Sequence, residues 1–396
     1  MTDLARRSGP LSGITVVELA GLGPVRFTGM MLADMGADVI RLDRAAPPDE
    51  GRDGRLAADD DALPINRGRR SVAIDMKRDE GRAIALDLIA QADVFIEGFR
   101  PGVTERLGIG PAVCMERNQR LVYGRVTGWG QDGPLAQEPG HDINFLALTG
   151  ALASFARFGE RPVPPVNLLG DYSGGGMLLV VGVLAALHNT RTTGIGQVVD
   201  AAIVDGVSSE LVQMHGRRAQ GQWTDEPGTN AFDTGAPWYE VYETADGKYL
   251  ALGALEGRFY QALLAGLGLD AGDAPQWDRA SWPALKIRFA ETIRRRTRDE
   301  WSDVFAGAEA CVTPVFTLAE APTHPHNRAR GVFDDDAGRI QPAPAPRFSA
   351  SPSAIGDPPP EVGQHTIDVL EALGRDRKTI DGLLADGVVT SFGQPA

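Results

Sequence analysis

Alternating strand and helix patterns at the start of the chain constrain its fold more than any other feature. Residues 14–19 and 37–42 are rich in β-branched and aliphatic side chains, which predicts two strands, and residues 28–35 between them predict a helix. Strands connected through a helix pair in parallel. The sequence therefore predicts an α/β domain with a doubly wound, Rossmann-like parallel sheet. The pattern continues with expected strands at 71–74, 93–97 and 121–126 and an expected helix at 80–92.

Composition limits the classes of partner. The 396 residues include 39 Lys and Arg against 53 Asp and Glu, which argues against non-specific binding to nucleic acid or to an anionic membrane. The two cysteines, Cys114 and Cys311, form no CxxC pair, so we expect a reducing compartment and no zinc site. The N-terminal residues lack the apolar region of a secretory signal, and the apolar run 177–187 is too short to span a bilayer. We therefore expect a cytoplasmic protein.

Two glycine- or arginine-rich turns are candidates for binding phosphate. The turn that begins Gly21-Leu22-Gly23 lacks the third glycine of a dinucleotide fingerprint and is interrupted by Pro24, so NAD binding is not expected. The run Asn66-Arg67-Gly68-Arg69-Arg70 precedes a strand and has two interpretations. It is either a solvated basic turn or a phosphate cradle, since guanidinium groups match phosphate geometry.

A third candidate binding segment follows the expected strand 93–97. Open parallel sheets bind ligands at the carboxyl ends of their strands. The segment contains Gly98, Phe99 and Arg106, which are therefore plausible ligand contacts.

The stretch from Gly140 to Gly176 carries the residues best suited to proton transfer. His141 follows a glycine, and Asp171 precedes the run Gly174-Gly175-Gly176 and then the apolar segment 177–187. Asp171 is thus expected at the start of a buried helix, where unpaired backbone N–H groups favour negative charge. Glycines allow a substrate to approach those N–H groups closely, so an oxyanion could be stabilised beside a base.

The pattern changes near residue 212, which suggests a second domain. We expect a large domain at residues 1–212, a small α+β domain at 213–325, and a return segment at 326–396 that completes the large domain with a C-terminal helix. Within the small domain, residues 238–244 and 248–253 predict a hairpin across Ala245-Asp246-Gly247.

Several motifs in one order resemble the class III CoA-transferase family, and within it the racemases of 2-methylacyl-CoA thioesters. The resemblance covers nearly the whole chain. Its main motifs are Gly-Ala-Asp-Val at 36–39, Asn-Arg-x-Arg-Arg-Ser at 66–71, Arg-Pro-Gly-Val at 100–103, Gly-Trp-Gly-Gln-x-Gly-Pro at 128–134 and Gly-His-Asp-Ile-Asn at 140–144.

The resemblance implies an interlocked homodimer that acts on an acyl-CoA thioester without a metal or a further cofactor. It implies that His141 and Asp171 are the two catalytic bases, and that Glu256 of the partner subunit supports His141. The implied substrate and CoA contacts are Arg44, Arg69, Gly98, Phe99, Arg100, Arg106, Asn167 and Tyr239. The implied reaction is removal of the α-proton on one face and its return on the other, through an enolate.

Two other activities remain open on the same fold. In a CoA-transferase, the Asp171 carboxylate would attack the thioester and carry the acyl group covalently, without a general base at His141. A catalytically idle CoA-binding dimer would bind ligand without exchanging the α-proton. Residues 215–222 and 231–234 depart from the apolar surface usual in such racemases, so a ring-bearing or oxygenated acyl group is compatible with the sequence.

Overall fold

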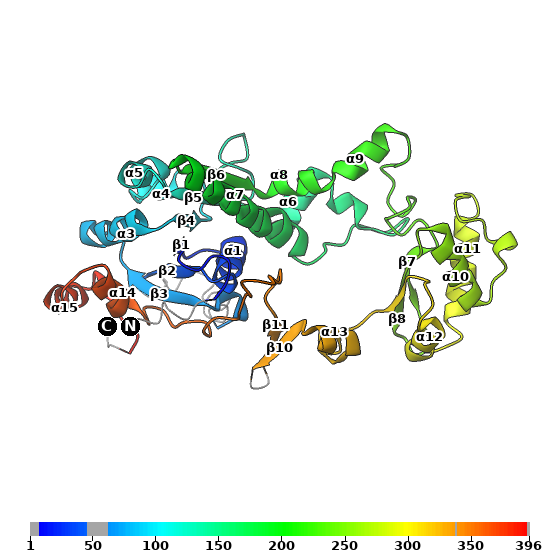
Figure 1. Ribbon diagram of the computed structural model, residues 1–396. Helices are drawn as coiled ribbons and strands as arrows, with labels where there is room; N and C mark the ends of the chain where they lie inside the picture. Colours follow the sequence, from blue (N-terminus) through cyan, green and yellow to red (C-terminus); the bar gives the residue numbers. More distant parts are fainter. Residues whose placement is uncertain (1–7, 46–61, 337–338, 394–396) are drawn as a thin grey trace. The chain divides into compact units, whose positions relative to one another are not determined.

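The computed structural model describes residues 8–45, 62–336 and 339–393 (Figure 1). These residues divide into two compact units. Unit 1 consists of Met1–Leu146, Val166–Glu210 and Phe333–Ala396, and unit 2 of Ala147–Pro165 and Leu211–Val332.

Unit 1 contains a seven-stranded sheet with the order β12-β3-β2-β1-β4-β5-β6. All neighbours pair in parallel except β12, which joins the edge of β3 in the antiparallel direction. The predicted parallel sheet is therefore confirmed. The strands are β1 (Thr15–Leu19), β2 (Asp38–Arg44), β3 (Arg69–Ile74), β4 (Val94–Glu97), β5 (Val122–Thr127), β6 (Gln197–Ala202) and β12 (Val389–Thr390).

Helices cover both faces of this sheet. A hydrophobic core forms between one face and side chains of α3, α5, α14 and α15, and α1 and α7 pack together with the π-helical segment η4 on the other (Figure 1). The helices of unit 1 are α1 (Gly23–Asp34), α3 (Asp79–Gln91), α4 (Val103–Arg106), α5 (Pro111–Arg117), α6 (Asp142–Thr149, which crosses into unit 2), η4 (Leu168–Met177), α7 (Leu178–Thr193), α8 (Ile203–Glu210), α14 (Thr366–Ala372) and α15 (Arg377–Ala385). The 3-10 turn Pro64–Asn66 and the hairpin strands β10 (Phe333–Asp336) and β11 (Arg339–Pro342) also belong to unit 1.

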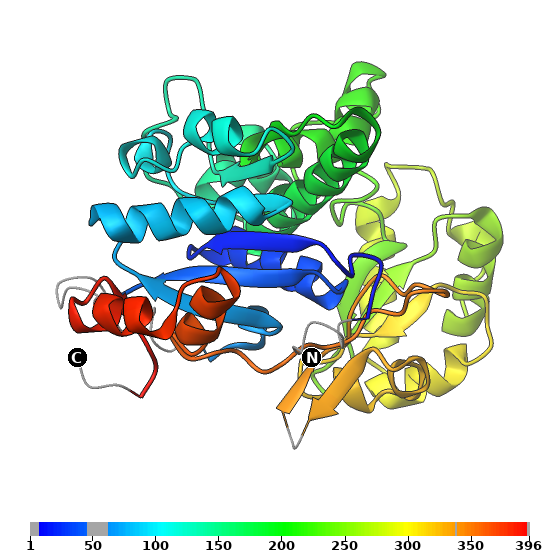
Figure 2. The ribbon, with the colours of Figure 1, turned by 60° about the vertical axis from the view of Figure 1, so that its left-hand side comes forward.

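Both ends of the chain build unit 1. Figure 2 shows the red C-terminal helices α14 and α15 beside the blue N-terminal strands. The contact is specific, because the backbone N–H of Ala73 donates to Thr366 Oγ1 at 3.1 Å and that of Gly363 donates to Ser71 Oγ at 2.8 Å. The C-terminal segment thus closes the β3 side of the sheet.

Helix α1 begins earlier than the sequence pattern indicated. The prediction began at residue 28, but the helix starts at Gly23 with a proline in its first turn. Proline is well suited to that position because the first backbone N–H groups of a helix have no intrahelical partner. Pro24 therefore starts the helix and does not interrupt it.

The apolar helix is also longer than the run at 177–187. η4 and α7 form one continuous helix, Leu168–Thr193, of 26 residues. Among the described residues it is the one helix whose length and apolar composition would suffice to cross a membrane. Its inner side chains, including Leu179, Val180 and Val183, are buried.

Unit 2 packs helices around a three-stranded antiparallel sheet of order β7-β8-β9. Its core contains the fully buried Trp238 and Phe289. The strands are β7 (Tyr239–Glu243), β8 (Tyr249–Gly253) and β9 (Val312–Pro314), and the helices are α9 (Val212–Ala219), α10 (Gly257–Leu267), α11 (Trp282–Ile293), α12 (Arg298–Phe305) and α13 (Pro325–Arg330).

The division into units differs from the expected boundaries most in one segment; the longer segment of unit 2 also begins at Leu211 and ends at Val332, a few residues beyond the expected 213–325. Residues 147–165 were expected in the large domain, but they group with unit 2. Arg157 forms an ion pair with Glu240 at 3.2 Å, and a Cβ on Gly228 would lie 2.1 Å from the backbone nitrogen of Phe158. These contacts between residues distant in sequence carry no local sequence signal.

Candidate active site

The order of the strands places the loop after β1 beside the loop after β4. β1 pairs with β2 on one side and with β4 on the other, so the chain changes direction across the sheet between β1 and β4. Ligands of doubly wound folds bind at such a switch point, beyond the carboxyl ends of the strands. Here the loop after β4 approaches α1 so closely that a Cβ on Gly98 would lie 2.4 Å from Val25 Cγ2.

Asp171 lies beside this switch point. A Cβ on Gly23, at the start of α1, would be 3.7 Å from Asp171 Oδ2. Asp171 itself is in the first turn of η4. π-Helical turns are rare and occur often at functional sites, and this one brings the carboxyl group to the N-terminus of α1.

The glycines after Asp171 serve helix packing, which differs from the expected role of opening the backbone to a substrate. Gly174, Gly175 and Gly176 are all buried. A Cβ on Gly174 or Gly175 would lie within 3.0 Å of side chains of α8, and one on Gly176 would lie 2.9 Å from α1. Their lack of side chains lets η4 fit between the two helices.

Asp142 connects the two predicted catalytic residues. Its side chain is 5% exposed, and its Oδ2 accepts a hydrogen bond from the backbone N–H of Asp171 at 2.8 Å. A Cβ on Gly170 would lie 2.5 Å from the same oxygen, so this hydrogen bond requires a glycine there. His141 is the residue directly before Asp142, and is thereby held close to Asp171.

His141 is exposed and stands immediately before α6. Its backbone N–H donates to Asn144 Oδ1 at 3.0 Å, and its carbonyl accepts from the backbone N–H of Asn144 at 2.8 Å. These bonds fix the backbone of His141 at the helix start and leave its imidazole at the surface.

The carboxyl group of Asp171 is electrostatically perturbed. Burial raises its pKa, a hydrogen bond from Asn167 and the charge of His141 lower it, and the charge of Asp142 raises it further. The Asn167 amide nitrogen is 3.4 Å from Asp171 Oδ2, which is a long contact. Among the residues the structure describes, no guanidinium or ammonium group pairs with Asp171.

A buried ion pair orders the loop after β4. Glu97 is fully buried; its Oε1 accepts from Arg125 Nε at 2.7 Å, and its Oε2 accepts from the backbone N–H of Phe99 at 2.7 Å. The loop is thereby fixed where it leaves the sheet. Of the predicted ligand contacts, Gly98, Arg100 and Arg106 are exposed and Phe99 is half-buried. Arg44, also exposed, ends strand β2, which β1 separates from β4.

The basic turn at 66–70 is neither a solvated turn nor an open phosphate cradle. Arg69 is 1% exposed; its Nε donates to Glu18 Oε2 at 2.8 Å and its Nη1 to the carbonyl of Ile65 at 2.7 Å. Arg67 pairs with Asp34 at 2.6 Å and Arg70 pairs with Asp38. The guanidinium of Arg69, expected to contact CoA, therefore lies inside unit 1 with its donors engaged by protein oxygens.

Two predicted site residues belong to unit 2. Glu256 is exposed and stands immediately before α10, with no side-chain hydrogen bond to the helix start. Tyr239 begins β7, is 39% exposed, and its ring meets that of Phe232 edge-on at 5.2 Å.

Sequence reasoning missed Glu97 as a site residue and assigned Asp142, next to His141, a structural role in orienting that histidine or capping a helix. Glu97 was expected only as the end of a strand, and the hydrogen bond from Asp171 to Asp142 was not anticipated. The adjacency of Asp142 to His141 was a usable signal for Asp142, whereas the partners of Glu97 come from distant parts of the chain.

Comparisons with known proteins agree with the motifs. The model of CoA-transferase family III matches residues 11–366. The chain is 42% identical to α-methylacyl-CoA racemase of Mus musculus and 40% identical to that of Homo sapiens, over 96% of this chain and 98% of each relative. It is 30% identical to the β subunit of succinyl-CoA–L-malate CoA-transferase of Chloroflexus aurantiacus, over 96% of this chain and 98% of that one.

A solved structure shares the fold. The crystal structure of a CAIB/BAIF family protein from Brucella suis superimposes with a TM-score of 0.79 at 27% identity, covering 92% of this chain and all of that one. With the family model matched over nearly its full length, the chain belongs to CoA-transferase family III.

Proposed function

We propose that this protein interconverts (R)- and (S)-2-methylacyl-CoA thioesters. The observation that carries the proposal is the hydrogen bond from the backbone of Asp171 to Asp142, the neighbour of His141. This bond joins the backbone of Asp171 to the residue next to His141, and the charge of His141 acts on the Asp171 carboxyl, whose pKa is raised; both observations support a site that contains the two groups. The relatives that are 40% and 42% identical are α-methylacyl-CoA racemases, which supports a racemase reaction for this protein.

In the proposed reaction one of the two groups removes the α-proton and the other returns a proton to the opposite face. Burial raises the pKa of Asp171, so its protonated form persists to higher pH and it is better able to donate a proton. The enolate oxygen is stabilised by the N-terminus of α1, which has no side-chain cap and begins beside Asp171. The thioester itself acidifies the α-carbon, and the proposed reaction uses no metal or further cofactor.

The CoA portion would bind along the switch point of the sheet. Arg44, Arg100 and Arg106 are exposed at or after the carboxyl ends of β2 and β4, where guanidinium groups can pair with phosphates. Gly98 and Phe99 lie in the same loop. We assign Arg69 a supporting role beneath this surface, because its guanidinium is occupied by Glu18.

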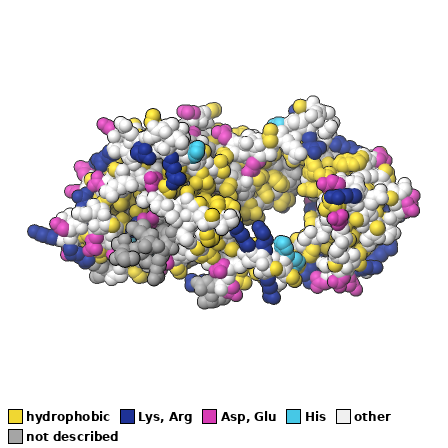
Figure 3. Space-filling model, in the orientation of Figure 1, with side chains coloured by type: hydrophobic (Ala, Val, Ile, Leu, Met, Phe, Trp, Pro, Cys, Tyr) yellow, Lys and Arg dark blue, Asp and Glu magenta, His cyan; other side chains and the backbone are white. Residues whose placement is uncertain are grey.

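We further propose a homodimer in the cytoplasm, with Glu256 and Tyr239 of the partner subunit completing the site and Glu256 supporting His141. Glu256 is exposed and bonds no helix end. The outer side of the continuous helix η4–α7 exposes Met177, Leu178 and Val181, and Figure 3 shows hydrophobic side chains over this region. An apolar surface of this kind favours burial against a second subunit.

Deuterium exchange tests the proposed reaction. Each enantiomer of a 2-methylacyl-CoA is incubated with the protein in deuterated water, together with a second carboxylic acid as a CoA acceptor. Uptake of one deuterium at the α-carbon with loss of optical activity is the expected result. Transfer of CoA to the acceptor without α-exchange would instead establish the transferase reaction, for which the 30% identical relatives provide the precedent.

Replacing His141 by alanine distinguishes the roles of His141 and Asp171. Exchange from the enantiomer whose proton His141 removes should fall by about 10²–10⁴-fold, the usual contribution of a general base. Exchange of the other enantiomer's α-proton, which Asp171 removes, should fall less. His188→Ala, at an exposed position on α7, is the matched control. Equal exchange rates in His141→Ala and the unmodified protein would remove His141 from the mechanism.

A further inference from the structure

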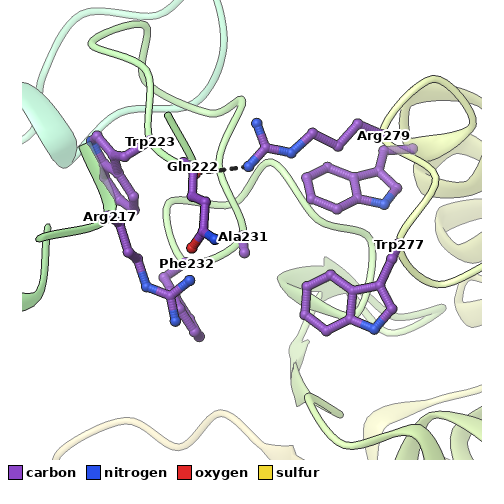
Figure 4. A pocket seen from close by; sticks show the side chains of 8 residues that line it. Arg217, Gln222, Trp223, Ala231, Phe232, Trp277 and Arg279 are labelled. Atoms are coloured by element: carbon purple, nitrogen blue, oxygen red, sulfur yellow. Dashed lines mark hydrogen bonds between the residues drawn. The ribbon is translucent and has the colours of Figure 1, made fainter. Parts of the chain in front are cut away.

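Unit 2 contains a cavity that the proposed proton transfer does not use. Its volume is about 240 Å³. Figure 4 shows Arg217 and Phe232 on one side, Trp277 and Arg279 on the other, and Gln222 between them. The lining thus combines aromatic rings with two guanidinium groups.

The aromatic part of the lining is anchored to the core. Trp282 is 4% exposed and its Nε1 donates to the carbonyl of Gln276 at 2.9 Å. The fully buried Trp238 donates to the same carbonyl at 3.0 Å, and its ring meets that of Trp277 at 4.9 Å. Trp277 itself remains 59% exposed. A large ring is therefore held at the surface on a fixed support.

Both guanidinium groups of the lining rest on aromatic rings. The Cζ of Arg217 is 4.8 Å from the centre of the Phe232 ring, and that of Arg279 is 5.6 Å from the Trp282 ring. In the described part of the chain neither forms an ion pair, whereas the adjacent Arg218 pairs with Asp225 at 2.9 Å. Stacking covers the faces of a guanidinium and leaves its N–H edge available to an anion.

One donor of this pair is buried and unsatisfied. Arg217 Nε is shielded from solvent and has no hydrogen-bond partner in the described structure. A buried donor without a partner is costly and calls for an explanation. The Nη2 of Arg279 already donates to the carbonyl of Gln222 at 2.9 Å, which holds that side chain at the cavity. A carboxylate in the cavity would pair with the Arg217 guanidinium and offset part of the charge of the two cations.

We propose that this cavity binds a planar aromatic carboxylate, with its ring against Trp277 and its carboxylate between Arg217 and Arg279. The cavity is smaller than the about 300–1,000 Å³ typical of sites for whole ligands, so it fits a ring-sized group and excludes an entire CoA. Such a group has two sources. It is either a free aryl acid or the aryl-carboxylate end of an acyl chain; the second source alone rests on the proposed function.

Calorimetric titration of the full chain with naphthalene-2-carboxylate tests the proposal. We expect binding with quenching of tryptophan fluorescence, and at least tenfold weaker binding of the neutral naphthalene-2-carboxamide, since charge-assisted hydrogen bonds to guanidinium are the stronger ones. Arg217→Gln should weaken binding of the acid at least tenfold. Arg218→Gln, the neighbouring position outside the cavity, should leave it unchanged.

A second variant tests whether weaker binding in Arg217→Gln could result from misfolding. Trp277 is mostly exposed, so Trp277→Ala should fold normally and still lose affinity for the naphthoate. The proposal is overturned if the acid and the amide bind equally, if neither binds at millimolar concentration, or if Arg218→Gln weakens binding as much as Arg217→Gln.

Competition identifies the source of the ring. An acyl-CoA whose chain ends in a carboxyphenyl group is added to the naphthoate complex. Displacement of the naphthoate assigns the cavity to the acyl chain, and simultaneous binding assigns it to a free acid; both results uphold the aromatic-carboxylate site. Because this measures binding alone, its outcome is independent of whether the protein exchanges α-protons.

Discussion

Glu18 and Asp171 are two carboxyl groups of unit 1 whose pKa values are both raised, in each case mainly by burial. Glu18, at the centre of the sheet, is 0% exposed and accepts a hydrogen bond from Arg69 at 2.8 Å. Asp171 is only partly buried and contacts the amide of Asn167 at 3.4 Å. Helix α1 touches both, with Gly29 over Glu18 and Gly23 beside Asp171.

The difference teaches that a raised pKa does not by itself identify a catalytic acid. Structural ion-pair networks also perturb the pKa values of carboxyl groups, as active sites do. Glu18 has a permanent cation beside it and no access to solvent, so its proton cannot be exchanged with a substrate. Asp171 has neither restriction and stands next to an exposed histidine. Accessibility and, within the described residues, the absence of a guanidinium partner distinguish the two when taken together with the pKa.

The largest expected effect comes from Asp171→Asn. Exchange of the α-proton should fall by about 10²–10⁴-fold, because the amide cannot donate or accept the proton. Deuterium incorporation followed by mass spectrometry measures this. If the variant kept its exchange rate, Asp171 would be a structural carboxyl group like Glu18.

The same variant has a pH-dependent effect on stability. Because the pKa of Asp171 is raised on folding, the native state retains its proton longer than the unfolded state does. The group therefore contributes full stability below its unfolded pKa and loses that contribution as pH rises through its folded pKa. Asp171→Asn should be at least as stable as the unmodified protein at pH 8, measured by thermal unfolding, and its stability should fall less between pH 4 and pH 8.

Removing the cation beside Glu18 should lower the stability of the protein. Arg69→Ala leaves a buried carboxylate without its partner, which typically lowers the free energy of unfolding by about 3–5 kcal/mol. Denaturant unfolding measures this, with Arg100→Ala as the exposed control. Unchanged stability in Arg69→Ala, combined with weaker CoA binding, would restore the phosphate-binding role that the sequence suggested for Arg69.

Gly29→Ala tests how closely α1 covers the ion pair. A Cβ there would lie 1.9 Å from Glu18 Oε2 and 2.6 Å from Arg69 Nη2, so the pair must shift. Overpacking of this kind costs about 1–3 kcal/mol. The control is Gly216→Ala, on helix α9 with no atom within 4 Å of the new Cβ, which should not destabilise the protein. Similar stability losses for both variants would contradict a close fit at Gly29.

The smallest expected effect is that of Arg100→Ala. The side chain is exposed, so stability should be unchanged while affinity for an acyl-CoA falls about tenfold, or about 1.4 kcal/mol, the size of one charged hydrogen bond. Titration with CoA measures the loss, which should shrink at high salt. A loss of stability without a loss of affinity would place Arg100 with the structural arginines.

The sequence predicted the elements of unit 1 well where local pattern decides them. β1, β2 and α3 lie within a few residues of their expected positions, because alternating β-branched strands and amphipathic helices are strong local signals. The edge strand β12 has only two residues and was not anticipated. Its pairing with β3 depends on a segment more than three hundred residues away in sequence, for which no local pattern exists.

The candidate site also combines features that local sequence determines with features that depend on contacts between distant residues. The sequence by itself determined the parallel sheet and the family, and it predicted that a histidine and an aspartate of two separate motifs act together. Only the tertiary structure decided that Arg69 is a core residue and that the three glycines after Asp171 allow η4 to pack closely against α1 and α8. It also decided that the Asp142 side chain accepts a hydrogen bond from the backbone of Asp171. The reason is physical. Residue type and spacing set local conformation, whereas burial, ion pairing and pKa depend on neighbours brought from distant parts of the chain.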